Sequence, residues 1–223
     1  MSLHEAARDN KPDIVSALLS ENPSLASSLD DDSRTPLHWA CTMQHSAIVC
    51  LLLPHIGEID DLTDEAGWTP VHIAAAVGSN SILELLMAHD PQPDVNLPTS
   101  TGATALHVAV SKGHVDTVHL LIDTYKCSVR AKDKMGRTAL HRAAAGGSQP
   151  LVKRLVAAGA VVSATDKDGW TALHHALAEG HGDVAVLLVQ LGADTGAADS
   201  SGATPVDVAN EQVRAYFTRA VGL

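Results

Sequence analysis

Residues 35–40 read TPLHWA, and variants of this hexapeptide recur along the chain. The fourth position of each copy is histidine, except in the last copy, where it is aspartate. These residues, termed anchors, are His4, His38, His72, His107, His141, His174 and Asp207. Successive anchors lie 33 to 35 positions apart. Such regular spacing predicts a stack of similar units rather than one conventional globular core.

Two further columns of residues keep the register of the anchors. An alanine follows each anchor by two positions: Ala6, Ala40, Ala74, Ala109, Ala143, Ala176 and Ala209. An aliphatic residue follows each anchor by fourteen positions: Leu18, Leu52, Leu86, Leu121, Leu155, Leu188 and Val221. The alanines suit a short first helix that packs closely on its neighbours, and the leucines suit the buried stripe of a second helix.

Residues near each anchor predict how these elements begin and end. Threonine followed by proline, as at Thr35 and Pro36, suits a helix start, because threonine can cap a free backbone N–H group and proline fits the first helical position. A glycine such as Gly78 follows the first helix, where a left-handed cap is expected.

An Asp-x-x-Gly step between repeats, as at Asp64 and Gly67, predicts a type I turn at the tip of a finger-like hairpin. Ser33 replaces the glycine of this step in the second repeat, and Thr99 replaces the aspartate in the fourth. Neither replacement touches the predicted core columns.

A period near 33 residues with the pattern T-P-L-H-x-A is the signature of the ankyrin repeat. The sequence therefore predicts an all-α fold, an ankyrin-repeat solenoid of seven repeats, each with paired antiparallel helices and a β-hairpin finger. We expect a single domain over residues 1–223, with repeats at about 1–29, 30–63, 64–98, 99–132, 133–165, 166–198 and 199–223. The first and last repeats depart from the pattern and are expected to cap the stack.

Composition narrows the class of protein. Hydrophobic residues make up 45% of the chain and charged residues 18%, which fits a folded protein. Three cysteines are too few for a disulfide scaffold, so we expect buried thiols in a reducing compartment. No apolar run has the length of a signal peptide or a membrane span. We therefore expect a protein of the cytoplasm and nucleus with no membrane partner.

Residues 174–183, HHALAEGHGD, look at first like a metal site, because zinc prefers imidazole and carboxylate ligands. The repeat pattern accounts for His174 as an anchor and for His181 in the turn between two helices. Only His175 and Glu179 are particular to this repeat, whereas a zinc site needs about three converging ligands. We therefore predict no metal and no cofactor.

Enzymatic activity is not predicted. No phosphate-binding glycine loop and no nucleophile elbow occurs in the sequence, so we expect no catalytic residue. A metal-dependent enzyme centred on His175 and Glu179 is retained as an alternative that metal analysis would test.

The exposed surface is instead expected to bind another protein. The concave face of an ankyrin stack is formed by the finger tips and the exposed side of the first helices. Residues just after the anchors lie there, among them Trp39 and Ile73, as do residues just before the T-P or T-A pair, among them Arg34 and Trp68. Tryptophan and arginine dominate binding hot spots, and the core does not require large side chains at these positions. Their occurrence on adjacent repeats predicts a binding surface.

Charge divides the chain into three segments. Residues 1–100 have 15 acidic and 3 basic side chains, residues 101–154 have 3 acidic and 9 basic ones, and residues 155–223 have 8 acidic and 3 basic ones. The respective net charges are −12, +6 and −5. The basic segment includes Lys112, Arg130, Lys132, Lys134, Arg137 and Arg142. This division predicts a partner with a basic patch facing the N-terminal half and acidic groups facing the middle. The acid excess argues against nucleic acid.

Departures from the general ankyrin pattern resemble one family. The stretches are DDSRTPLHWAC (31–41), DEAGWTPVHIAA (64–75), TALHRAAAGG (138–147) and GWTALHHALAEGHGDVAVLLVQLGA (169–193). They are similar to the gankyrin family of proteasome assembly chaperones, and more so to its fungal member, over nearly the full chain. The resemblance implies that the concave face clasps the C-terminal domain of one AAA-ATPase subunit of the proteasome base. It also implies that the chaperone holds this subunit during assembly, delays docking onto the proteolytic core and leaves the finished particle.

The resemblance also implies a set of partner-binding residues by matching motif position. They are Asp32, Arg34, Trp39, Glu65, Trp68, Ile73, Lys112, Arg137 and Arg142. Arg137 depends more on the charge argument than on the match. We expect no nucleic-acid partner and a monomer when the protein is free.

One departure from the family concerns a second partner. The animal member carries a Leu-x-Cys-x-Glu motif in its sixth repeat, where this chain has HALAE (175–179), so retinoblastoma-type binding is not expected. An ankyrin adaptor for an unrelated signalling or transcription protein remains the main alternative function.

Overall fold

The computed structural model describes residues 1–222, and the elements there are helices, turns and loops. The α-helices are α1 (Leu3–Arg8), α2 (Pro12–Glu21), α3 (Pro36–Thr42), α4 (Ser46–Leu52), α5 (Pro70–Val77), α6 (Asn80–Met87), α7 (Ala105–Lys112), α8 (Val115–Asp123), α9 (Ala139–Ala145), α10 (Gln149–Ala157), α11 (Ala172–Ala178), α12 (Gly182–Gln190) and α13 (Glu211–Val221). Three 3₁₀ helices, η1 (Pro23–Ser27), η2 (Leu53–His55) and η3 (Ile59–Asp61), follow second helices of the first two repeats.

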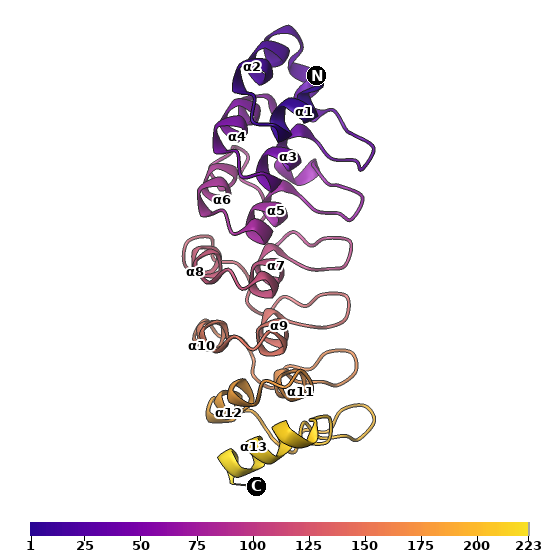
Figure 1. Ribbon diagram of the computed structural model, residues 1–223, viewed down its shortest axis with the longest axis vertical. Coiled ribbons are helices and arrows are strands. Elements are labelled where there is room, and N and C mark those ends of the chain that lie inside the picture. Colours follow the sequence, from indigo (N-terminus) through magenta and orange to yellow (C-terminus); the bar gives the residue numbers. More distant parts are fainter. Residues whose placement is uncertain (223) are drawn as a thin grey trace. The chain divides into compact units, whose positions relative to one another are not determined.

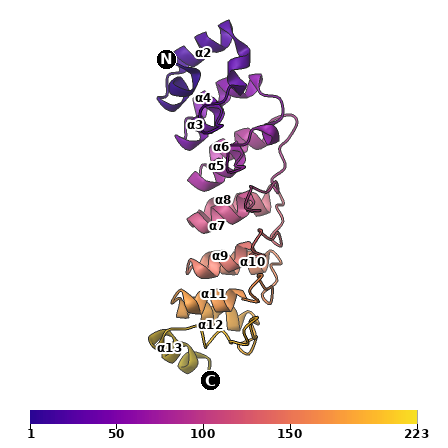
Figure 2. The same cartoon turned by 90° about the vertical axis from the view of Figure 1, so that its right-hand side faces the viewer.

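The chain divides into two compact units, residues 1–108 and the residues from 109 onward, and the boundary falls within α7. Within each unit, the odd-numbered helices up to α11 form a first layer and the even-numbered helices a second layer (Figure 1). The loops between successive pairs, termed fingers, project from the side of the first layer, and Figure 2 shows the pairs of each unit stacked one after another. The ankyrin-repeat fold is confirmed, whereas one domain over residues 1–223 stays a prediction.

The predicted core columns are buried, with exceptions at the two end repeats. All seven column alanines expose 6% of their surface or less. The five inner leucines, Leu52, Leu86, Leu121, Leu155 and Leu188, are fully buried. Leu18 and Val221 are only half-buried, so the prediction is wrong there, and Leu19 and Phe217 take their places in the core. Within residues 1–222 an end repeat packs against a neighbour on one side only, and its second helix buries a different and narrower stripe.

The cysteines follow the prediction in two cases of three. Cys41 and Cys127 are buried, and burial raises the pKa of the Cys127 thiol to about 12. Cys50 is exposed on α4, which corrects the expectation that all three thiols are buried.

Several anchor histidines, His38 among them, join their own repeat to the next one. His38 Nδ1 accepts a hydrogen bond from the backbone N–H of Thr35 at 3.1 Å, and its Nε2–H donates to the carbonyl of Trp68 in the following finger at 3.0 Å. The same pair of bonds recurs at His141 and His174. His72 Nδ1 also accepts from its threonine N–H, but its Nε2–H donates to the carbonyl of Leu97 within its own repeat. These partners assign the neutral Nε2–H tautomer, because Nδ1 must accept and Nε2 must donate.

The last repeat replaces its first helix with a turn, so the prediction of paired helices in all seven repeats is wrong for the seventh. Asp207 Oδ2 accepts from the backbone N–H and the hydroxyl of Thr204 at 2.8 and 2.6 Å, as an anchor histidine would. A carboxylate has no N–H to donate to a following repeat. The Arg214 guanidinium instead donates to the carbonyls of Val206, Asp207 and Ala209 and satisfies this end of the turn.

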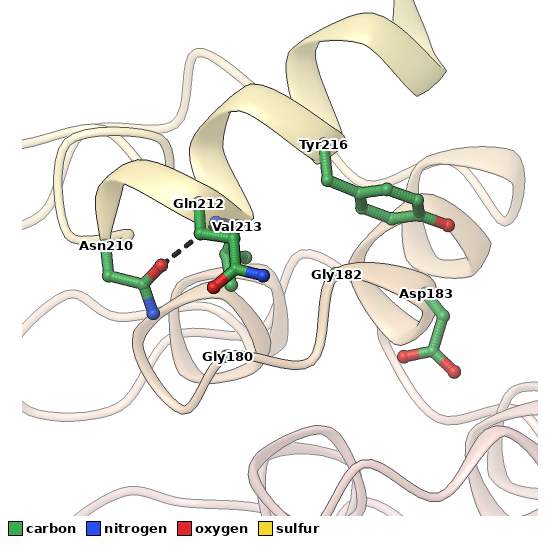
Figure 3. Close-up of a pocket in the computed structure, with 7 residues that line it drawn as sticks. All are labelled: Gly180, Gly182, Asp183, Asn210, Gln212, Val213 and Tyr216. Atoms are coloured by element: carbon green, nitrogen blue, oxygen red, sulfur yellow. Dashed lines mark hydrogen bonds between the residues drawn. The ribbon is translucent and has the colours of Figure 1, made fainter.

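Helix α13 closes the second unit against the α11–α12 turn. Asn210 caps it by accepting from the backbone N–H of Val213 at 2.9 Å. The Tyr216 ring lies so close to Gly182 that a Cβ on this glycine would come within 2.6 Å of the ring. Figure 3 shows the polar pocket that this docking leaves between the helix and the turn.

The fingers are tight turns without β-strands, so the predicted hairpins are corrected to loops. Asp64 Oδ1 accepts from the backbone N–H groups of Ala66 and Trp68 at 3.0 and 2.9 Å, and Gly67 closes the turn with a φ of 72°. The next finger adds a backbone bond from Ser100 N–H to the Ala66 carbonyl. One backbone bond between neighbouring fingers is too few for a strand ladder, and no residue from 1 to 222 lies in a strand.

Replacing Ser33 with glycine is expected to stabilise the protein by about 0.5–1 kcal/mol. Ser33 has a φ of 59°, a left-handed conformation that glycine adopts without steric cost. Urea denaturation of the wild type and Ser33→Gly measures the change. Ala66→Gly, at a finger position without positive φ, is the control and should be neutral or destabilising. A less stable Ser33→Gly protein would contradict the prediction.

Candidate functional site

Finger aspartates orient the large side chains of the first layer. In each case Oδ1 holds the aspartate's own turn, as described for Asp64, and Oδ2 is left to accept another donor. Asp30 Oδ2 accepts from the Trp39 indole N–H at 2.6 Å, and Asp133 Oδ2 accepts from Arg142 Nη2 at 2.7 Å. Both donors lie nine positions after their aspartate, on the first helix of the same repeat.

A second arrangement links a finger to the one before it. Arg34 Nη2 lies 3.5 Å from Asp64 Oδ2, and the Trp170 indole N–H donates to Asp199 Oδ2 at 2.9 Å. Arg137 Nε lies 3.8 Å from Asp166 Oδ2. These contacts show that the large arginine and tryptophan side chains have partners within the fold, whereas the sequence suggested only a binding role for them. Trp39, Arg142 and Arg34 are therefore fixed before any partner arrives.

The first unit gathers its two arginines around one indole ring. Arg34 Cζ lies 5.3 Å from the centroid of the Trp39 ring, and Arg8 Cζ lies 6.0 Å from it. Cation–π attraction of this kind stabilises exposed pairs by about 0.5–1 kcal/mol. Arg34 Nε is buried without a hydrogen-bond partner among the described residues, so this arginine keeps a donor unsatisfied.

Asp30 remains ionised beside this cluster. Burial raises the pKa of its carboxyl, but the hydrogen bonds from Trp39 and from the backbone of Arg34 and Asp32 outweigh that effect. The pKa of Asp30 therefore lies below its usual value. The negative charge that orients the indole persists at neutral pH.

The predicted acidic residues of the first unit lie at finger tips. Asp32 and Glu65 are both exposed. Among residues 1–222, no ion pair involves either carboxylate. Their charges are thus not neutralised by other described residues, and their role in binding a basic partner stays a prediction.

Trp68 differs from the other two tryptophans because its indole N–H has no hydrogen bond within the described chain. The equivalent Trp170 donates to the aspartate of the following finger, Asp199. The finger that follows Trp68 has Thr99 at the aspartate position. The Thr99 hydroxyl oxygen accepts from the backbone N–H of Ala103 at 3.2 Å. Threonine has no second side-chain oxygen that could accept from the indole. Trp68 is half-buried beside His72, with its polar edge unused.

Ile73 corrects the sequence prediction. It exposes only 6% of its surface, and Val108, which has the same place in the next repeat, exposes 5%. Aliphatic side chains at this position are short enough to be covered by their neighbours, whereas Trp39 and Arg142 extend beyond that cover and remain half-buried. Ile73 contributes to the core and offers a partner little surface.

In the second unit the three predicted basic residues have different surroundings. Arg142 bonds both Asp133 and the Ser111 hydroxyl, and Arg137 lies beside Asp166. Lys112 is exposed at the end of α7. Two arginines are therefore partly neutralised, and Lys112 has the most accessible charge of the three.

His175 and Glu179 do not converge on a metal. His175 is buried, with Nε2 2.9 Å from Asp166 Oδ2 and its ring edge-on to Trp170, whereas Glu179 is exposed. In residues 1–222 no group of three histidine, cysteine, aspartate or glutamate side chains could hold an ion. The structure gives His175 a packing role inside the finger network.

The α-helices have between 6 and 11 residues. None of those in residues 1–222 has the length and apolar character needed to span a bilayer.

Comparisons with known proteins agree with this architecture. A family model described as ankyrin repeats (three copies) matches residues 1–62, 55–133 and 124–199. The chain is 44% identical over 159 residues to the probable 26S proteasome regulatory subunit p28 of Saccharomyces cerevisiae, which covers 70% of this chain and 69% of that protein. It is 41% identical over 138 residues to the ankyrin repeat-containing protein C6C3.08 of Schizosaccharomyces pombe, covering 60% and 58% of the two chains.

A solved structure extends the likeness to nearly the full length. The ankyrin repeat domain of Bcl-3, a member of the IκB family, superposes with a TM-score of 0.82 at 28% identity and covers 98% of both chains. The repeat fold is thus shared widely, and the similarity to p28 is the more specific finding. The chain belongs to the ankyrin-repeat proteins and, among them, to the gankyrin family that includes the yeast proteasome regulatory subunit p28.

Proposed function

We propose that this protein is a non-catalytic chaperone for assembly of the proteasome regulatory-particle base. It binds the C-terminal domain of one AAA-ATPase subunit through the fingers and first-layer helices. It is a monomer when free and acts in the cytoplasm and nucleus. Its similarity to a proteasome regulatory subunit supports the proteasomal partner.

The observation that carries the proposal is the arrangement of the first unit. Asp32 and Glu65 are exposed on the same two fingers that carry Arg34 and Trp68. Arg34 is paired with Trp39, and the Trp68 indole has an unused donor. A basic partner surface meets the acids, and a carbonyl or carboxylate oxygen accepts from Trp68. Because Arg34 and Trp39 are already held in place, ordering these two side chains costs little entropy on binding.

Thr99→Asp is expected to weaken partner binding about five- to tenfold, a loss of about 1–1.4 kcal/mol. The new Oδ2 would accept the Trp68 indole N–H, as Asp199 does for Trp170, and withdraw it from the partner. Thr99→Asn is the matched control, because its side-chain oxygen can serve the turn while its NH₂ group cannot accept from the indole. Calorimetric titration with the ATPase domain measures both variants. Equal affinity of Thr99→Asp and wild type would show that the Trp68 indole N–H does not bond to the partner.

Fractionation of host-cell extracts tests the assembly role. The proposal expects the protein in complexes that contain a single ATPase or an incomplete base, and expects its absence from particles that contain the proteolytic core. Detection in stoichiometric amounts on the finished particle, at the same abundance as on base precursors, would contradict a role restricted to assembly.

The alternative is an ankyrin adaptor for an unrelated signalling or transcription protein. The likeness to the Bcl-3 ankyrin domain over 98% of both chains favours it, since the same repeat frame occurs there. Affinity purification with wild type and with the triple variant Asp32→Lys, Glu65→Lys, Trp68→Ala separates the two. Loss of ATPase subunits alone supports the chaperone, whereas recovery of a different protein and no ATPase with wild type supports the adaptor.

A further inference from the structure

Two residues of the basic segment, Arg130 and Lys132, have no place in the proposed ATPase-binding surface. They line one pocket of about 360 Å³ in the second unit. The hydroxyl residues Ser163 and Thr165 line it as well, and Val161 and Ala164 form an apolar wall. Thr138 also lines the pocket, but its hydroxyl already bonds His141. The pocket thus combines two cations, the hydroxyl groups of Ser163 and Thr165, and a hydrophobic side.

Both cations are held in place by the next repeat. Arg130 Nε–H donates to the carbonyl of Gly159 at 3.0 Å, and Lys132 Nζ donates to the carbonyl of Thr165 at 2.8 Å. These bonds use one N–H of each group, so the arginine keeps four donors and the lysine two. The remaining donors are oriented at no further cost in side-chain entropy.

No carboxylate neutralises either cation within the described residues. Arg137, Arg142 and Arg154 each lie within 4 Å of an aspartate oxygen. Arg130 and Lys132 take part in no ion pair among residues 1–222, although both are exposed at the same pocket. Two like charges at one pocket repel each other unless an anion lies between them.

We propose that this pocket binds a phosphate group carried on an organic body. A phosphate dianion offers three oxygens to the guanidinium, the ammonium and the two hydroxyls, whereas a carboxylate offers two oxygens and one charge. Val161 and Ala164 contact the organic portion. The group comes from either a phosphorylated side chain of a partner or a small organic phosphate. The inference does not depend on the proposed chaperone function.

Titrations followed by ¹H–¹⁵N NMR test the site on the full chain. The probes are phenyl phosphate, benzoate and the capped tripeptide acetyl-Ala-phosphoserine-Ala-amide. We expect the amide signals of Ser163 and Thr165 to shift with phenyl phosphate and to shift less with benzoate at equal concentration. Tighter binding of the tripeptide than of phenyl phosphate assigns a phosphorylated partner, and the reverse order assigns a small organic phosphate. Benzoate binding as tight as that of phenyl phosphate would overturn the assignment of phosphate.

The double variant Arg130→Gln, Lys132→Gln is expected to bind phenyl phosphate at least about tenfold more weakly. At position 130 a glutamine amide nitrogen takes the place of Nε and can still donate to the Gly159 carbonyl. Both replaced residues are exposed, so we expect the fold to be retained, and the melting temperature checks this. The matched control pairs Lys134→Gln with Lys112→Gln, which removes two exposed charges of the same segment. An equal loss in the control would show general charge attraction and overturn the site, as would unchanged binding in the double variant.

Discussion

The combined substitutions Asp32→Lys and Glu65→Lys are expected to weaken binding to the partner ATPase domain about 100-fold or more. Each replaces an exposed carboxylate at a finger tip with a cation, so attraction to a basic patch becomes repulsion at two places. A tenfold loss at each position corresponds to about 1.4 kcal/mol. Calorimetry at low ionic strength measures the change, because salt screens such interactions.

The control is a second double variant that makes the same change of net charge on another part of the first unit. Asp13→Lys and Glu21→Lys alter exposed acids on α2, a second-layer helix, and should leave the affinity within about twofold of wild type. If both double variants lose affinity equally, overall charge and not the finger tips governs binding. If neither loses affinity, the acidic finger tips have no part in recognition.

Acidification from pH 7.5 to 4.5 is expected to destabilise the protein through its anchor histidines. Burial lowers the pKa of His38, His72 and His174, and burial together with the nearby His175 lowers that of His141 to about 4. Protonation would also place a second N–H on Nδ1, which must accept from the threonine N–H. The folded protein therefore resists a proton that the unfolded chain binds near pH 6.5.

This difference in proton binding determines whether the free energy of unfolding rises or falls with pH. Between about pH 6.5 and 4 the unfolded chain binds more protons, so the free energy of unfolding decreases as the pH decreases. The stabilisation is fully present above pH 6.5 and is lost as the pH falls towards the folded-state values. At pH 4.5 the His141 shift alone corresponds to about 2–3 kcal/mol. The lowered pKa values of Asp133 and Asp166 act below this window.

Urea denaturation across this pH range measures the loss, and two variants assign it. His141→Gln should lower the free energy of unfolding by about 2–3 kcal/mol at pH 7.5 and reduce the difference between pH 7.5 and 4.5. His55→Gln, at a position outside the anchor column, should leave the pH dependence unchanged. A stability that stays level from pH 7 to 4.5 would contradict the neutral, bridging role of the anchors.

The sequence predicted the repeat architecture well because the same physical requirement recurs every 33 to 35 residues. An anchor such as His38 and an alanine such as Ala40 have similar surroundings in the inner repeats, so their identity repeats too. The structure of the first and last repeats was not predicted, because among the described residues each of them packs against one neighbouring repeat only. Phe217 lies outside the recurring columns, and Asp207 is the anchor that is not a histidine. The columns therefore do not predict what either residue contacts.

The site was less predictable because exposure depends on side-chain length and on contacts between fingers. Ile73 and Trp39 have the same position in consecutive repeats, yet one is buried and the other half-exposed. The hydrogen bond from Trp39 to Asp30 joins residues nine positions apart, and repeat spacing gives no direct sign of it. The Thr99 departure was visible in the sequence, but its consequence for Trp68 required the Trp170–Asp199 contact as a comparison.

Isothermal titration of the purified protein with the isolated C-terminal domain of each proteasomal ATPase, at two salt concentrations, tests the central claim most directly. We expect 1:1 binding to one domain of the panel, with an affinity that decreases as salt increases. Absence of binding to every domain, or binding of all domains with equal affinity, would contradict it.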